Sequence, residues 1–417
     1  MKFVSTCIFV LCSISQVYSK GCSLAISFDD ERYLPVYVNN SAHEAQLALS
    51  HKGNIELNAG ESVLLSCPNP KNTLKLTKTK SAMAECVGDE TIKIWNEEED
   101  YQSAICSKGL KGVAMRTNED CGGGEGNIIK LGFPQERKEF LSTIEVCHDI
   151  NNSVTLYTVH ILYGSEIKYA SKESYRPSFS TDELAPDVPA KTAYKKVTQK
   201  VVFRKLLGST KLAKKYVNAK SFLVTGHLAP DADFLFASWQ FSTYFYVNAI
   251  PQWQAINAGN WKRLENLVRE SAAAYNENIM VYTGTYGVLS LPDVNDVSTE
   301  IYLSKDKLPV PKFVYKILYS EESKQGIAFV SVNNPFLTEL DKSDRLCTDI
   351  CNDYGWGDES WNDGEKGFIY CCNAHKLLKS ILTGPNIRIR GILKPPKSST
   401  LFQKLGSKVT SFINQIG

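Results

Sequence analysis

Short apolar runs broken by turn residues dominate the first part of the chain. Ser62–Ser66 and Ile92–Trp95 are two such runs, and Gly, Pro and Asn residues separate them from their neighbours. Short runs bounded by turn residues are typical of β-strands, and no long helical periodicity interrupts them. The pattern predicts a small β domain over residues 20–148, with a boundary near Ile150.

Longer strands are expected beyond that boundary. Val154–Tyr163 alternates and is rich in β-branched and aromatic residues, which favours a strand. Ser171–Pro189 carries three prolines among polar residues and is predicted to be a surface loop. Further strands are predicted at Asn278–Gly284, Val310–Tyr319 and Gly326–Val332, and a short helix at His375–Leu382. We therefore expect a second domain over residues 149–393, followed by a tail, 394–417, with a loosely docked helix.

The first 19 residues have the composition of a secretory signal. Lys2 precedes the apolar run Phe3–Val17, and small residues follow near Ser19, where cleavage would fall. That run is too short to span a bilayer, and no later segment reaches about 18 apolar residues. Two glycosylation sequons, at Asn39 and Asn151, also fit export. We expect a secreted, extracellular protein that does not bind membranes.

Removing the signal would leave ten of the twelve cysteines. An even number in an exported chain favours disulfides over metal thiolates. Cys371 and Cys372 are adjacent, so their Cα atoms lie about 3.8 Å apart, below the usual range for a disulfide. Each is therefore expected to bond to Cys347 or Cys351; zinc is the weaker alternative because ligand histidines at suitable spacing are missing. The other six cysteines, all in the first region, are Cys22, Cys67, Cys86, Cys106, Cys121 and Cys147.

Positive charge is concentrated in one segment, Lys191–Lys220. The whole chain carries +2, this segment carries +10 with no acid, and the rest of the chain therefore carries −8. Apolar residues interleave at helical spacing, and Gly208 is a plausible stop. A solvated amphipathic helix is the plain interpretation, but a phosphate-attracting surface is the alternative. The predicted nucleic-acid contacts are Lys195, Lys196, Lys200, Arg204, Lys205, Lys211, Lys214 and Lys215.

The stretch Val224–Arg269 follows directly and carries the candidate chemistry. A short apolar strand delivers His227 to its end, and a helix is predicted from Asn257 onward because Trp261, Leu264, Leu267, Val268 and Ala272 recur at helical spacing. Asn257 and Glu265 lie about two turns apart on one side of that helix. A histidine facing oxygen ligands suits a hard cation such as Mg²⁺ together with a general base.

This stretch closely resembles the active-site region of the DNA/RNA non-specific endonucleases, the ββα-metal nucleases. The matching motifs are Gly226-His227-Leu228-Ala229-Pro230, Asn248-x-x-Pro251-Gln252 and Asn257-x-Gly259-x-Trp261-x-x-Leu264-Glu265. The resemblance implies an α+β fold with a central antiparallel sheet flanked by helices. The amino-terminal region is similar to the extension of secreted arthropod members, although that match is weaker.

The resemblance also implies roles. His227 would activate the attacking water, and Asn257 would be the only protein ligand of Mg²⁺, for which Mn²⁺ could substitute. Asn248 and Glu265 would support catalysis, Arg269 would face the phosphate, and Gln252 would contact nucleic acid. DNA and RNA would be bound through their phosphate backbones, and no protein partner is implied.

Several of these residues also have ordinary structural interpretations. Asn257 alone would be a helix N-cap, and Glu265 could pair with Arg269 four residues later. The family usually has Asp-Arg before the Gly-His pair, where this chain has Val224 and Thr225. Losing a phosphate-clamping arginine costs about 10²–10³ in rate. Two functions therefore remain: a Mg²⁺-dependent nuclease of low turnover, or a sequence-independent nucleic-acid-binding protein with residual hydrolysis.

Overall fold

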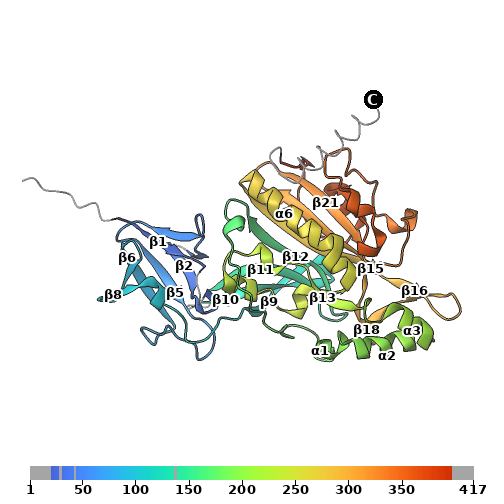
Figure 1. Cartoon of the computed structure of the whole chain (residues 1–417), viewed down its shortest axis with the longest axis horizontal. Coiled ribbons are helices and arrows are strands. Elements are labelled where there is room, and N and C mark those ends of the chain that lie inside the picture. Colours follow the sequence, from blue (N-terminus) through green and yellow to red (C-terminus); the bar gives the residue numbers. More distant parts are fainter. Residues whose placement is uncertain (1–19, 28–30, 42–43, 136–138, 397–417) are drawn as a thin grey trace, which may run out of the picture.

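The computed structural model in Figure 1 describes residues 20–27, 31–41, 44–135 and 139–396. The signal peptide expected at residues 1–19 and the helix expected in the tail lie outside these ranges. No helix within them is long and apolar enough to cross a membrane.

The amino-terminal part is built from β-strands, as its pattern predicts. The two-stranded sheet pairs β1 (Cys22–Ala25) with β4 (Asn54–Leu57). The larger sheet, in the order β3-β2-β5-β6-β7-β8, contains β2 (Val36–Ser41), β3 (Glu44–Leu47), β5 (Ser62–Ser66), β6 (Ser81–Gly88), β7 (Thr91–Ile94) and β8 (Glu97–Asp100). Alternate residues of β5 and β6 are buried, so one face of this sheet forms a core.

A second, nine-stranded sheet begins earlier than expected. Its main path, in the order β22-β21-β20-β15-β12-β11-β10-β9, is antiparallel throughout, and β23 (Gly391–Ile392) pairs with β21 in parallel. The other strands are β9 (Val113–Cys121), β10 (Gly126–Pro134), β11 (Phe140–Asp149), β12 (Val154–Tyr163), β15 (Asn278–Val288), β20 (Pro311–Ser320), β21 (Gln325–Val332) and β22 (Ile369–Asn373).

The expected boundary near Ile150 falls inside this sheet, in the hairpin where Asp149 pairs with Val154. The two large sheets instead separate between Asp100 and Val113. The predicted boundary was wrong because Cys121 and Cys147 were grouped with the first region. Their disulfide joins β9 to β11. The segment from β9 to β11 is therefore part of the central sheet.

Helices cover both faces of the central sheet. Figure 1 shows α6 (Lys262–Tyr275) lying across one face, where Leu264 and Val268 belong to the same core as the strand residues Val281 and Leu318. On the other face, α7 (Ala374–Ser380) packs Leu377 into a separate core. This arrangement confirms the α+β class and the helix-flanked antiparallel sheet.

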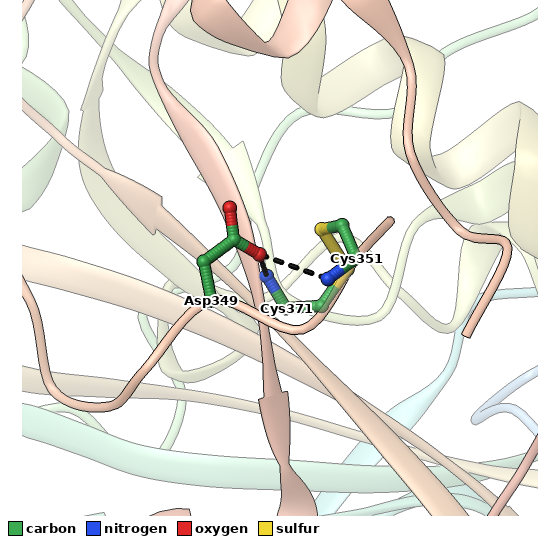
Figure 2. A group of neighbouring side chains, drawn as sticks. All are labelled: Asp349, Cys351 and Cys371. Atoms are coloured by element: carbon green, nitrogen blue, oxygen red, sulfur yellow. Dashed lines mark hydrogen bonds between the residues drawn. A yellow bond between two sulfur atoms is a disulfide. The ribbon is translucent and has the colours of Figure 1, made fainter. Parts of the chain in front are cut away.

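The five disulfides pair cysteines within the two expected groups. Cys22–Cys86 and Cys67–Cys106 lie in the amino-terminal part, and Cys347–Cys372 and Cys351–Cys371 confirm that the adjacent cysteines bond to separate partners. Figure 2 shows Asp349 beside the last pair, where one carboxylate oxygen accepts from the backbone N–H groups of Cys351 and Cys371 at 2.9 and 3.1 Å. Since both sulfurs are bonded to each other, this cluster is a braced loop and not a thiolate metal site.

The basic segment folds into three helices. These are α1 (Ala190–Ala193), α2 (Lys196–Leu207) and α3 (Thr210–Tyr216), and Gly208 ends α2 in a left-handed conformation, as predicted. Phe203 and Leu207 are buried, whereas Val197 and Val201 are 77% and 54% exposed. The apolar residues at helical spacing therefore do not all face the core.

The remaining strands and α-helices are short. They are β13 (Leu223–His227), α4 (Ala237–Phe241), β14 (Ala249–Trp253), α5 (Gln254–Ile256), β16 (Ser290–Pro292), β17 (Ser298–Glu300), β18 (Tyr302–Ser304) and β19 (Lys307–Pro309).

Candidate active site

Two short strands place the central residues of the motif side by side. β13 and β14 pair antiparallel, with His227 opposite Ala249 and Gly226 opposite Ile250. Gln199 of α2 anchors β13 by accepting from the N–H of Leu223 at 3.0 Å and donating to its carbonyl at 2.8 Å. The basic helices and the strand that carries His227 are therefore joined rigidly.

Two amide side chains converge on Gly226. A Cβ atom added there would lie 2.6 Å from Oε1 of Gln252 and 3.3 Å from Oδ1 of Asn257. Only a glycine allows this close approach. The structure thus brings the amide oxygen of Asn257 next to the backbone of the residue that precedes His227.

Gln252 is fully buried, and neither its Nε2 nor its Oε1 has a hydrogen-bond partner among the described residues. This placement contradicts its expected contact with nucleic acid on the surface. A buried amide without a hydrogen-bond partner is costly, and this one lies beside Gly226, as Asn257 does.

The helix that carries Asn257 begins earlier than its apolar pattern predicts. α5 starts at Gln254, and Asn257–Trp261 forms a π-helical turn that is kinked at Gly259 (φ −94°, ψ −121°) and leads into α6. Asn257 has ordinary helical angles (φ −57°, ψ −44°) and is not an N-cap. Its side chain is therefore not committed to capping. π-turns of this kind are frequent at functional sites.

The carboxy-terminal disulfide region holds this turn in place. Asn260 is buried and donates from Nδ2 to the carbonyls of Ser360 and Gly367, each at 2.7 Å. Arg263 forms an ion pair with Asp358 at 3.1 Å. These contacts connect the metal-ligand candidate to the segment that Cys347–Cys372 and Cys351–Cys371 stabilise.

The ring of His227 lies among aromatic side chains. The centroids of Phe179 and Tyr244 are each 4.9 Å from the imidazole centroid. Burial lowers the pKa of His227 from its usual value to about 4; Asp231 opposes this shift and Arg176 reinforces it. The imidazole is therefore neutral near pH 7, as a general base requires.

One hydrogen bond defines the tautomer of His227. The hydroxyl of Thr243 donates to the carbonyl of Gln240 at 2.8 Å, so toward His227 it can only accept. Its oxygen lies 3.4 Å from Nε2 of His227, which places the imidazole proton on Nε2. Nδ1 is left as the basic nitrogen.

Asn248 is fully buried and bonded only to the backbone. Its Oδ1 accepts from the N–H of Ala229 at 3.0 Å, and its Nδ2 donates to the carbonyls of Ala229 and Thr243, each at 2.9 Å. These bonds fix the turn that follows His227. Asn248, expected among the catalytic residues, therefore has the geometry of a positioning residue.

A buried group of charges lies on the α6 face of the sheet. Asp233 bonds Arg269 at 2.7 Å and His160 at 3.0 Å. Burial opposes ionisation of Asp233, but His160 and Arg269 outweigh it and hold the pKa of the carboxyl at about 2. Arg269 is therefore bonded to Asp233 and to Asn266, and the alternative pairing with Glu265 is not formed.

Lys316 of β20 completes this group and is fully buried. Its Nζ donates to Thr283 Oγ1 at 2.6 Å and to the carbonyl of Leu228 at 3.4 Å. Burial lowers the pKa of Lys316, whereas Asp233 and Glu265 raise it. Nothing in the apolar pattern of β20 singled out Lys316, because its burial depends on α6 packing above it.

Glu265 is only partly buried, but its surroundings shift its ionisation strongly. Removal from water raises the pKa of its carboxyl to about 7; Lys316 and Arg269 oppose this shift, and Asp233 reinforces it. A carboxyl that titrates near neutrality can both accept and donate a proton.

Arg176, in the loop Ser171–Pro189, also reaches this region. Its Nε forms an ion pair with Oδ2 of Asp231 at 3.0 Å, and the hydroxyl of Tyr244 donates to the same oxygen at 2.7 Å. Sequence reasoning missed Arg176 because its loop shows only proline and polar residues, and 50 residues separate it from His227. Its proximity to a histidine is visible only in the fold.

Thr225 stands on the same face of β13 as His227, since side chains alternate along a strand. It is partly buried and lies opposite Pro251. An arginine at this position would project toward the same side as the imidazole.

All ten cations of Lys191–Lys220 are exposed, and none forms an ion pair with an acid in the described part of the chain. The predicted nucleic-acid contacts on α2 and α3 therefore lie on the surface with their charge uncompensated. Lys196 also places its Nζ 3.4 Å from the ring centroid of Phe222, directly before β13.

Comparisons with known proteins identify the family. A family model described as DNA/RNA non-specific endonuclease matches residues 124–377. The chain is 33% identical over 372 residues to the salivary endonuclease of Lutzomyia longipalpis, covering 87% of this chain and 84% of that protein. This protein belongs to the DNA/RNA non-specific endonuclease family.

One further relative is similar over almost the whole chain. Salivary protein Tsal1 of Glossina morsitans morsitans is 27% identical and covers 92% of this chain and 96% of its own length. A chain in the crystal structure of the EndoG/EndoGI complex is 18% identical, covers 63% of this chain and 92% of its own, and has a TM-score of 0.37. The family match begins at residue 124, so it includes β10 and β11. Members of the family are metal-dependent nucleases, which makes nucleic acid the substrate class.

Proposed function

We propose that this protein is a secreted, Mg²⁺-dependent endonuclease that hydrolyses phosphodiester bonds of DNA and RNA without reading their bases. The observation that carries the proposal is the convergence of Asn257 and the unpartnered amide of Gln252 on Gly226, one residue before a neutral, partly buried His227. Five disulfides and the salivary names of the relatives support secretion.

The donor set suits a hydrated hard cation. Asn257 offers an amide oxygen that no described residue hydrogen-bonds, and Gln252 offers a second polar group to the water around such an ion. Mg²⁺ prefers oxygen ligands and keeps several waters, and Mn²⁺ accepts the same donors. When bound, the ion supplies positive charge that stabilises the leaving oxygen of the phosphodiester.

The side chains of this chain perform the remaining steps. Nδ1 of His227 accepts the proton of the attacking water, while Thr243 and the two flanking rings hold the imidazole in position. Asn248 keeps the turn after His227 rigid. Glu265, with its pKa near neutrality, holds or releases a proton at the edge of the site.

Cations then compensate the charge that develops on the phosphate. Arg269 is held by Asp233, and Arg176 is held by Asp231, so both guanidinium groups are oriented before substrate arrives. The exposed cations of α2 and α3 attract the rest of the polyanion. Because phosphate contacts read no bases, we expect DNA and RNA to be substrates alike.

Incubation of plasmid DNA and of RNA with the purified protein, in Mg²⁺ or in EDTA, tests the proposal. Hydrolysis is expected in the Mg²⁺ reactions and not in the EDTA reactions, and His227→Ala should abolish it. His375→Ala is the matched control, since His375 is exposed on α7, which covers the opposite face of the central sheet. Hydrolysis that persists in EDTA, or that His227→Ala leaves intact, would contradict the mechanism.

Thr225 favours a second function, in which the protein binds nucleic acid tightly and cuts it slowly. The usual arginine beside the Gly-His pair is missing, yet the basic surface is complete. Equal background hydrolysis by the wild type and His227→Ala, together with salt-sensitive retardation of nucleic acid in gels, would favour this binding protein.

A further inference from the structure

Two adjoining hollows lie where the amino-terminal part meets the central domain. The first, ≈ 320 Å³, is lined by Phe179, Tyr244, Lys111 and Lys191, and the second, ≈ 300 Å³, by Tyr33, Arg32 and Lys108. They share the walls formed by Lys111, Tyr175, Pro177 and Phe241. We call the pair the junction groove. Volumes of this size are typical of ligand sites, which often lie at domain interfaces.

The junction groove reaches the two aromatic rings that flank the proposed general base. Phe179 and Tyr244, which line its first hollow, are the two rings that flank His227 at 4.9 Å. Farther along, the ring of Tyr175 stands edge-on to Phe241 at 5.6 Å and is 47% exposed. A polymer that extends from the reaction centre along the junction groove would therefore pass several aromatic rings in succession.

Positive charge accompanies these rings. Arg32, Lys108, Lys111 and Lys191 are exposed, and none of them forms an ion pair with a described acid. Asp182 is the acid that lines the groove. The lining therefore carries a net positive charge. Three of its cations come from the amino-terminal part.

Aromatic rings interleaved with unpaired cations are the chemistry of single-stranded nucleic-acid binding. Bases stack on the rings, and the cations neutralise the backbone. A duplex keeps its bases inside the stack, where such rings do not reach them, whereas unpaired bases can be splayed onto aromatic side chains. An acidic peptide would neutralise the cations but would offer no planar bases to stack on the aromatic rings.

We propose that the junction groove binds unpaired nucleotides of a single-stranded DNA or RNA segment that flanks the phosphodiester at His227. The inference rests on the proposed function and adds a substrate preference to it. The amino-terminal part is then a substrate-binding element, and single strands bind more tightly than blunt duplexes of the same sequence.

The test measures binding without hydrolysis. A labelled single-stranded 12-mer and its blunt duplex are titrated with the full chain in EDTA, and fluorescence anisotropy is recorded. Tyr175→Ala should weaken single-strand binding about 5- to 150-fold, the range for losing one stacked base, and should leave duplex binding within about twofold. Tyr175→Phe, which keeps the ring, should bind like the wild type.

Charge is tested separately. Lys111→Gln should reduce the slope of log affinity against log salt by about 0.7 for the single strand, as expected for one phosphate contact. An oligonucleotide that carries 5-iodouracil should cross-link to peptides containing Tyr175 or Tyr33. Cross-links confined to α2 and α3, or equal losses for single strand and duplex in Tyr175→Ala, would overturn the assignment.

Failure of the groove and failure of the nuclease are distinguishable. If hydrolysis requires Mg²⁺ and His227 but Tyr175→Ala binds single strands like the wild type, only the groove assignment is wrong. If His227→Ala cuts like the wild type but Tyr175→Ala loses single-strand binding, the catalytic proposal is wrong and the groove stands. Heparin that competes equally against the wild type and Tyr175→Ala would show a general polyanion surface, which also contradicts the groove.

Discussion

Gln252 and Asn248 are two fully buried amides near His227 that should respond oppositely to substitution. Asn248 makes three hydrogen bonds to the backbone, at 2.9, 2.9 and 3.0 Å, whereas Gln252 makes none with described residues. Each buried hydrogen bond contributes about 1 kcal/mol net. Asn248→Leu should therefore lower the free energy of unfolding by about 3 kcal/mol, while Gln252→Met should leave it unchanged or raise it by about 1 kcal/mol.

The two variants should also differ in the kinetic property that they lose. Gln252→Met should need about 10- to 100-fold more Mg²⁺ for half-maximal hydrolysis, the range for losing a group that orients a metal's ligands. Asn248→Leu should lower the rate about 10²-fold, because the turn after His227 loses its fixed position, while its Mg²⁺ requirement stays near that of the wild type.

Urea unfolding in EDTA, followed by tryptophan fluorescence, measures stability because Trp253 and Trp261 are buried beside the site. Mg²⁺ titrations of plasmid nicking measure the metal requirement. A loss of stability in Gln252→Met as large as in Asn248→Leu would show that the Gln252 amide is hydrogen-bonded in the folded protein. An unchanged Mg²⁺ requirement in Gln252→Met would refute the proposed contact with the hydrated ion.

Three further predictions concern charge. Thr225→Arg should raise the rate of hydrolysis about 10²-fold or more, since it restores a cation on the face of β13 that carries His227. An unchanged rate in single-turnover assays would contradict this prediction. Because the pKa of Glu265 is about 7, its ionised fraction rises from about 10% at pH 6 to about 90% at pH 8, so kcat/KM should rise over this range in the wild type and stay flat in Glu265→Gln. Burial lowers the pKa of His148 to about 4, with a smaller opposing effect of Asp149. The unfolded chain therefore takes up a proton at His148 between about pH 6.5 and pH 4 that the folded protein does not, and this residue should lower stability by about 3 kcal/mol over that interval. Because the pKa of His227 is also about 4, urea unfolding of His148→Gln should still show a loss, but one about 3 kcal/mol smaller than that of the wild type.

Local patterns were sufficient for much of the fold and part of the site. The strand Val154–Tyr163, the stop at Gly208 and the partners of Cys371 and Cys372 are as predicted, because each depends on neighbouring residues or on short covalent reach. The motif also singled out His227 and Asn257 as candidates, and their catalytic and metal-binding roles stay predictions. The domain boundary was wrong, since the pairing of β11 with β12 cannot be read from cysteine spacing.

Arg176, Asp233 and Lys316 show where sequence reasoning stopped. Each is an ordinary charged residue in its local context, yet Arg176 lies close enough to His227 to lower its pKa, and Lys316 is buried between Thr283 and the carbonyl of Leu228. Long-range packing brings these groups together from separate strands and loops, and the sequence around each one carries no sign of the others.

The chain's own residue order determined the family, the β-rich amino-terminal part and the helical character of the basic segment, and it proposed the histidine and amide of the candidate site. These follow from periodicity and from a motif in which neighbouring residues act together. Only the tertiary structure decided that Gln252 is buried, that Asn248 is committed to the backbone, and that Tyr33 and Tyr175 line adjoining hollows, one of which includes the rings beside His227. Burial and electrostatic environment arise from contacts between distant segments, and so they exist only once the chain has folded.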